Sequence, residues 1–180
     1  AEICGDTALM LAPRAEVASG AFFSGRRSGD EALALNADAE CAKRRALVAE
    51  WQRNLVLDTP DPVIDAMFAF AKIRAAESIY DTKGGLMHGP GGERFYAAIW
   101  ANDQAEYINP FFPFLGYETG NRSALCSFRH FARFMNPAYE PLPSSVIAEG
   151  DDIWNGAGDR GDAAMIAYGA ARYALARGER

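Results

Sequence analysis

The segment from Asp162 to about Ala176 constrains the fold of this chain more than any other, because its side chains are small on nearly every side. A helix without a polar face is usually buried all round, and small side chains let neighbouring helices approach it closely. We therefore expect a helix here that other helices enclose. The small residues behind this prediction are Ala163, Ala164, Ala167, Gly169, Ala170, Ala171 and Ala174.

Two long helices are predicted in the first half of the chain. Residues 30–57 contain good helix formers and few breakers, and Asp30 is a suitable N-cap. The next helix is expected from Pro62 to about Tyr80, because Asp61 can cap it and proline is favoured at the first helical position. Its expected apolar stripe consists of Ile64, Phe68, Ala71, Ala75 and Ile79.

Two shorter helices are predicted in the middle of the chain. The first begins near Asp103 and is expected to be kinked or split by Pro110 and Pro113. The second is capped by Asn121 and ends before Pro137. Its expected apolar side consists of Leu125, Phe128, Ala132 and Met135. The helices that begin at Pro62 and Asn121 are amphipathic, whereas those that begin near Asp103 and Asp162 are expected to be enclosed. This alternation is typical of helical hairpins arranged in an inner and an outer layer.

The remaining segments are predicted as loops or short strands. Residues 1–29 contain short apolar segments closed by Ser-Gly turns, which indicates the end of a β structure. Glycines and a proline between residues 84 and 92 argue against regular structure, so residues 83–100 are predicted as a loop. Residues 138–161 are predicted as a second loop.

The composition is that of a globular protein and argues against several classes of function. The chain has 180 residues, of which 49% are apolar and 23% charged. Its net charge of −6 argues against nucleic acid as a partner, because nucleic-acid binders need clustered positive charge. The recurring Arg122, Arg129 and Arg133 are interpreted as a solvated helix face. No apolar run is long enough to cross a membrane, and no signal peptide is visible.

Neither a metal centre nor a cofactor is predicted. Cys4, Cys41 and Cys126 are widely spaced and form no CxxC pair, and their odd number argues against a disulfide framework. The glycine-rich segment around residues 84–93 lacks the Lys-Ser/Thr ending of a phosphate-binding loop. The two histidines, His88 and His130, are interpreted as structural.

Tryptophan and aspartate recur together at two predicted inner helix starts. Trp100 precedes Asp103, and Trp154 precedes Asp159 and Asp162. If the two helices are parallel neighbours, these side chains converge at one end of the domain. An indole ring can cover the apolar face of a sugar, while carboxylates accept hydrogen bonds from its hydroxyl groups. The repetition therefore predicts a carbohydrate-binding site.

Cleavage of a glycosidic bond usually needs two carboxyl groups, and the same loops contain further acids. The catalytic candidates are Glu93, Glu149 and Asp152. Each singled-out residue also has a structural explanation, since Asp103 and Asp162 are good N-caps and the two tryptophans are good core anchors.

Two segments resemble the six-hairpin glycosidases, whose catalytic domain is an (α/α)6 toroid. They are HGPGGERFYAAIWANDQAEYINPFFPFLG and IAEGDDIWNGAGDRGDAAMIAYGAARYAL. The first is similar to the Trp-x-x-Asp segment at an inner helix start in glucoamylase-like and rhamnosidase-like members. The second is similar to the Trp loop and Asp-Gly-x-Ala helix start of glucoamylases. The resemblance implies that Trp100, Asp103, Trp154 and Asp162 lie beside one sugar.

The resemblance also implies a mainly α fold. Residues 1–29 would end a β-sandwich domain, residues 30–60 would form a linking helix, and residues 61–180 would form the first hairpins of an incomplete toroid. The implied substrate is an oligosaccharide or glycoside cleaved from a chain end, and the implied location is periplasmic or extracellular.

The resemblance leaves the catalytic acid open. In glucoamylase-like members both catalytic carboxyls lie further along the chain, whereas rhamnosidase-like members have the acid near the first inner helix, which favours Glu93. We therefore expect a glycosidase fragment that needs the remainder of the toroid for activity. The alternative is a non-catalytic helical carbohydrate-binding or scaffold domain.

Overall fold

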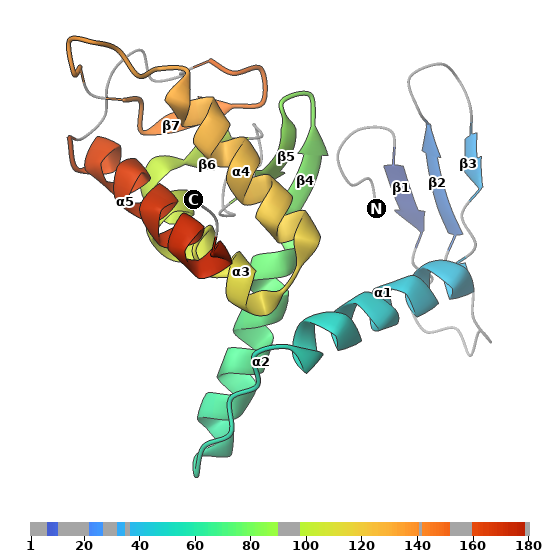
Figure 1. Ribbon diagram of the computed structural model, residues 1–180. Helices are drawn as coiled ribbons and strands as arrows, with labels where there is room; N and C mark the ends of the chain where they lie inside the picture. The colour runs from blue at the N-terminus through green and yellow to red at the C-terminus, as the bar shows by residue number, and fades with distance from the viewer. Residues whose placement is uncertain are drawn as a thin grey trace. The chain divides into compact units, whose positions relative to one another are not determined.

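The structure is a computed structural model that describes residues 7–10, 22–26, 32–34, 37–89, 98–140, 142–151 and 160–178. The chain divides into two compact units, Ala1–Glu50 and Trp51–Arg180. The described residues are mainly helical, as the sequence predicts, and their strands form small antiparallel sheets (Figure 1).

The first unit contains a three-stranded antiparallel sheet and most of a long helix. Strand β1 (Thr7–Met10) pairs with β2 (Phe22–Arg26), which in turn pairs with β3 (Ala32–Ala34). Helix α1 follows at Ala37–Arg53. The prediction of a helix from Asp30 is therefore wrong for residues 32–34, where pairing with β2 overrides the helix propensity of the segment. Asp30 itself lies outside the described residues.

The end of α1 is held by a lysine from the next helix, α2 (Pro62–Glu77). The Lys72 ammonium donates hydrogen bonds of 3.0, 2.8 and 3.1 Å to the carbonyl oxygens of Gln52, Asn54 and Leu55. The last carbonyls of a helix have no partner within the helix, so they need donors from elsewhere. Lys72 supplies them and fastens α2 to the segment that follows α1.

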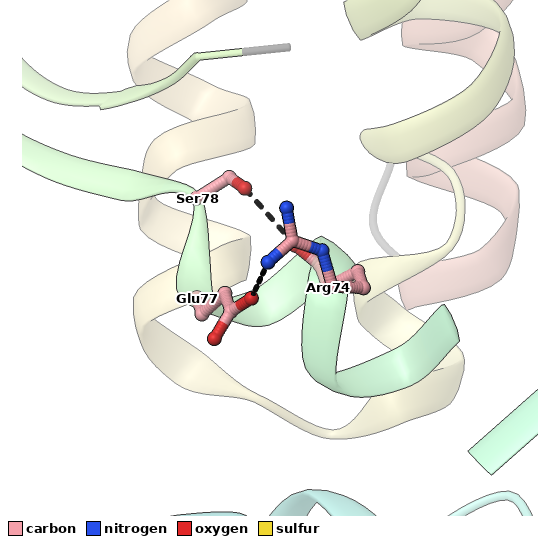
Figure 2. Close-up of polar contacts among 3 residues, drawn as sticks. All are labelled: Arg74, Glu77 and Ser78. Carbon is pink, nitrogen blue, oxygen red and sulfur yellow. Dashed lines mark hydrogen bonds and ion pairs between the residues drawn. The ribbon is translucent and has the colours of Figure 1, made fainter. Parts of the chain in front are cut away.

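The predicted start of α2 is confirmed. Asp61 accepts a hydrogen bond from the first turn, and Pro62 occupies the first helical position. The helix ends at Glu77, slightly earlier than predicted. There the Ser78 hydroxyl donates to the carbonyl of Arg74 at 3.0 Å, and the Arg74 guanidinium pairs with Glu77 (Figure 2).

Residues 79–88 form a β-hairpin where a helix end and a loop were predicted. Strand β4 (Ile79–Thr82) pairs with β5 (Gly85–His88), and Lys83-Gly84 form the two-residue turn, green in Figure 1. Glycine is favoured beside such turns because it accepts a left-handed backbone, and Gly85 has φ +98°. The glycines therefore shape a hairpin and do not prevent regular structure.

A second pair of strands also lies in segments predicted as loops. Strand β6 (Ala98–Trp100) pairs antiparallel with β7 (Ser145–Ile147). Their side chains are largely buried, so cross-strand packing stabilises them although each strand has only three residues.

The predicted split of the third helix is confirmed. After β6 the chain forms a π-helical turn, η1 (Asp103–Ile108), and then the single α-helical turn α3 (Phe112–Leu115). Pro110 lies between them, where its missing amide hydrogen and fixed φ prevent a continuous helix. The chain leaves α3 through Gly116, which has a left-handed backbone with φ +65°.

The second unit also contains the long helices α4 (Glu118–Ala132) and α5 (Arg160–Arg177). Helix α4 begins three residues before Asn121, so the predicted cap is wrong. Asn121 is buried instead, and its carbonyl oxygen accepts a hydrogen bond of 3.3 Å from the Tyr173 hydroxyl. The extended backbone of Tyr117 starts the helix without a side-chain cap.

The presence of α5 is confirmed, but its predicted enclosure is wrong for the described residues. Ile166, Gly169 and Tyr173 are buried along one side, whereas Ala164 and Ala167 are exposed. Small side chains permit close packing on any side of a helix, but they do not determine which sides are covered. The predicted apolar stripes on the other helices are also partly wrong, because some of their residues are exposed, namely Ile64, Ala71, Leu125, Ala132 and Met135.

The core of the second unit joins six of its elements. Its buried residues come from β5, β6, η1, α4, β7 and the segments around them, together with α5. They include Met87, Ile99, Ala105, Phe131, Val146 and Ile166. This core holds the two strand pairs against the helices and positions the residues described next.

Candidate functional site

Helices η1 and α5 touch closely. A Cβ added at Gly169 would lie 2.3 Å from the carbonyl oxygen of Ala105, so only glycine fits there. Further along both helices, the Arg172 guanidinium donates to the carbonyl of Glu106 at 3.2 Å. Residue numbers thus increase together at this contact, from Ala105 to Glu106 along η1 and from Gly169 to Arg172 along α5.

Contacts with α4 support this direction. The start of α4 lies at the end of α5, because Arg177 and Glu118 approach to 3.9 Å and the Tyr173 hydroxyl reaches Asn121. Helix α4 is therefore antiparallel to α5. The chain passes from η1 through α3 to the start of α4, and in doing so it follows the course of α5.

Asp103 and Asp162 both lie on the N-terminal side of the contact between η1 and α5. Asp103 is exposed at the start of η1, and Asp162 is half-buried in the first turn of α5. Trp100 is half-buried at the end of β6, three residues before Asp103. The other two predicted sugar-binding residues, Trp154 and Asp159, lie outside the described residues.

Glu149 lies near the other end of the strand pair β6–β7, away from Trp100. In the ladder, Trp100 pairs with Ser145, whereas Ala98 pairs with Ile147. Strand β7 therefore leads away from Trp100, and Glu149 follows beyond the opposite end of the ladder. The other catalytic candidates, Glu93 and Asp152, lie outside the described residues.

Glu149 lines an open cavity of about 660 Å³ in the second unit. The turn between β4 and β5 forms one wall, the last turns of α4 form another, and the segment after β7 completes it. The lining residues are Lys83, Gly84, Gly85, Cys126, Arg129, His130, Arg133, Ala148 and Glu149. The spacing of the arginines indicates a solvated helix face and does not predict a cavity, because the cavity depends on the hairpin that brings Lys83 to α4.

A small hydrogen-bond network joins the hairpin turn to α4. The Gly84 carbonyl accepts from His130 Nε2 at 2.9 Å and from Cys126 Sγ at 3.1 Å. A carbonyl can only accept, so His130 Nε2 carries the hydrogen, and in the neutral ring Nδ1 is free to accept. His130 Nδ1 accepts from the guanidinium of Arg133.

Burial determines the protonation of the two titratable groups in this network. It lowers the pKa of His130, and the nearby Arg133 lowers it further, although the hydrogen bond to Gly84 opposes the shift. Burial also raises the pKa of Cys126, against the opposing effect of Arg129 and Arg133. At neutral pH the network therefore contains an uncharged imidazole and an uncharged thiol.

The hairpin fits this position only because residues 84 and 85 are glycine. A Cβ at Gly84 would lie 2.4 Å from the carbonyl oxygen of Ala148, and a Cβ at Gly85 would lie 2.9 Å from Cys126 Sγ. The backbone of the hairpin therefore packs directly on α4 and on the segment after β7. This wall of the cavity is held by backbone contacts.

No family model, curated protein or solved structure matches the chain. Within the described ranges, no group of three or more His, Cys, Asp or Glu side chains is arranged to hold a metal ion. The helices that the structure describes include none that is long and apolar enough to span a membrane.

Proposed function

We propose that this chain is part of a six-hairpin glycosidase and that its second unit binds a sugar through Trp100, Asp103 and Asp162. The observation that supports this proposal most directly is the close contact between η1 and α5, which both aspartates precede in their helices. The exposed small side of α5 is suited to further helices of an (α/α)6 toroid.

The local chemistry suits a neutral, hydroxyl-rich ligand. The half-buried indole of Trp100 offers an apolar face, and the carboxylates of Asp103 and Asp162 accept hydrogen bonds from hydroxyl groups. Both aspartates lie in the first turns of their helices, where the partial positive charge of the helix favours an anionic side chain. Asp103 also begins a π-helical turn, a feature that is frequent at functional sites.

A second candidate function is a carbohydrate-binding domain without catalysis. It is favoured by the number of carboxylates at the cavity around Glu149. The described lining has one carboxylate, whereas glycoside hydrolysis usually needs two. Both candidates predict sugar binding, and only the first predicts that a longer chain hydrolyses glycosides.

Binding can be tested by isothermal titration calorimetry of the chain against a panel of neutral oligosaccharides. We expect Trp100→Ala and Asp103→Asn each to weaken binding about tenfold, on the scale of one lost ring contact or charge-assisted hydrogen bond. The matched controls are Tyr139→Ala, whose side chain is fully in solvent, and Asp81→Asn on the exposed face of β4. Equal losses in the controls, or no saturable binding of any sugar, would exclude the proposed site.

A further inference from the structure

The cavity beside Glu149 is strongly cationic, which the sugar-binding proposal does not explain. Its side chains include the cations Lys83, Arg129 and Arg133 and the single carboxylate Glu149. His130 and Cys126 add no charge at neutral pH, since burial keeps the first deprotonated and the second protonated. The described lining therefore has an excess of two positive charges.

The carboxylate does not neutralise the arginines. Glu149 faces Lys83 at 3.5 Å, and both side chains are largely exposed, at 50% and 83%. An ion pair this exposed contributes little to stability, so it is readily exchanged for other partners. The guanidinium groups of Arg129 and Arg133 remain available to a ligand.

Arg133 is held in place before any ligand arrives. One of its nitrogens donates to His130 Nδ1, and its guanidinium lies against the backbone of Gly150, where an added Cβ would be 2.8 Å from Nη1. His130 is in turn fixed by the Gly84 carbonyl. A guanidinium that is already oriented loses less entropy on binding, and its planar donor groups match the oxygen atoms of phosphate and sulfate.

We propose that this cavity binds a doubly charged oxyanion, namely a phosphate group carried as a monoester on a small organic molecule. The excess of two positive charges matches the charge of the group. The volume of about 660 Å³ lies within the range of small-molecule sites and exceeds what a bare ion fills, which favours an ester over the free ion. The proposal does not depend on sugar binding at Trp100.

The test is a titration of the 15N-labelled chain followed by NMR, at constant ionic strength. The probes are inorganic phosphate, sulfate and glucose 6-phosphate, with chloride and glucose as controls. We expect saturable shifts at the amides of Gly84, Gly85 and Arg133 with the oxyanions, and tighter binding of glucose 6-phosphate than of inorganic phosphate. Shifts that chloride reproduces would overturn the site, and equal affinity for ester and free phosphate would overturn the ester assignment.

Variants assign the binding to the cavity. We expect Arg133→Gln and Arg129→Gln each to weaken glucose 6-phosphate binding about tenfold, and Glu149→Gln to strengthen it, because a competing negative charge is removed. Arg122→Gln is the matched control, since this arginine is exposed on α4 and does not line the cavity. If Arg133→Gln disturbs folding, the glucose 6-phosphate titrations of Lys83→Gln and Glu149→Gln test the site instead, because both side chains are largely exposed.

Two results would contradict the assignment. In the first, the cavity variants lower the melting temperature but leave the titration unchanged, which would mean that the arginines only stabilise the C-terminal end of α4. In the second, Glu149→Gln weakens binding, which would make this carboxylate part of the binding site and not a competitor. Trp100→Ala serves as a further control and is expected to leave oxyanion binding intact.

Discussion

Gly169 of α5 lies against the main chain of Ala105 in η1, and a Cβ at Gly169 would fall 2.7 Å from the Ala105 Cα as well as 2.3 Å from its carbonyl oxygen. Atoms cannot approach this closely, so the two helices reach their present separation only with glycine at this position. The contact also constrains where Asp103 and Asp162 lie, because Asp103 is two residues before it in η1 and Asp162 is seven residues before it in α5.

Gly169→Ala is therefore expected to destabilise the second unit by about 1–3 kcal/mol, the usual cost of overpacking. In an exposed helix the same change stabilises by roughly 1 kcal/mol, so the sign of the effect identifies the contact. Urea unfolding measures it. Ala171→Val adds bulk at an exposed position of α5 and is the control, expected to change stability by less than about 1 kcal/mol. A more stable Gly169→Ala variant would contradict the close approach.

Lys72→Met is expected to destabilise the chain by about 2–3 kcal/mol, because three carbonyl groups lose a charged donor. The methionine keeps the length and apolar stem of the side chain. Chemical denaturation followed by tryptophan fluorescence is suitable, since the buried Trp51 lies next to the affected segment. Lys43→Met removes an exposed lysine paired with Glu40 and should cost less than about 1 kcal/mol. Equal effects of the two variants would show that Lys72 does not hold this junction.

His88 is expected to make folding less stable in mild acid. Burial lowers its pKa to about 4 against an ordinary 6.5, although carbonyl groups of Ala75 and His88 itself oppose the shift. Between these values the unfolded chain binds a proton that the folded chain does not bind, so stability rises with pH from about 4 to 6.5 and falls as pH decreases. The size of the effect is on the order of 2–3 kcal/mol.

The measurement is the free energy of unfolding of the chain and of His88→Gln at several pH values from 4 to 7. The variant should lose less stability on acidification than the native sequence. His130→Gln provides the comparison. Burial also lowers the pKa of His130, so this substitution should remove part of the same pH dependence of stability. Parallel pH profiles for His88→Gln and the native chain would show that the His88 imidazole is accessible to protons.

The sequence predicts the long elements of this fold better than its short ones. Helices α2 and α5 follow from Asp61-Pro62 and from the long alanine-rich segment, because both signals are local. The strands β3, β6 and β7 have only three residues each and depend on partners elsewhere in the chain, so no local pattern identifies them. The β4–β5 hairpin had a recognisable signal in the Lys83-Gly84 turn, but the glycines were interpreted as a loop.

The candidate site residues also differ in how well the sequence predicts them. The positions of Asp103 and Asp162 at helix starts follow from the sequence, and both residues precede the contact between η1 and α5. The cationic cavity could not be predicted, because Lys83 is distant in sequence from Arg129 and Arg133 and reaches them only through the hairpin. Arginines spaced four residues apart indicate a helix face, but they do not indicate what lies opposite.

The last prediction is that this chain alone does not hydrolyse glycosides efficiently, even if it binds them. An inverting enzyme needs two carboxyl groups roughly 6.5–9.5 Å apart, and a retaining enzyme needs them about 5–5.5 Å apart. Glu149 lies at the cationic cavity beyond the end of the β6–β7 ladder opposite Trp100, so it is poorly placed to act on a sugar held by Asp103. The assay uses a panel of aryl glycosides and oligosaccharides, with Asp103→Asn and Glu149→Gln measured alongside. We expect no turnover above that of a blank. Turnover of about 1 s⁻¹ or more, in the range of ordinary enzymes, that is lost in either variant would show that residues 1–180 already contain a complete catalytic centre.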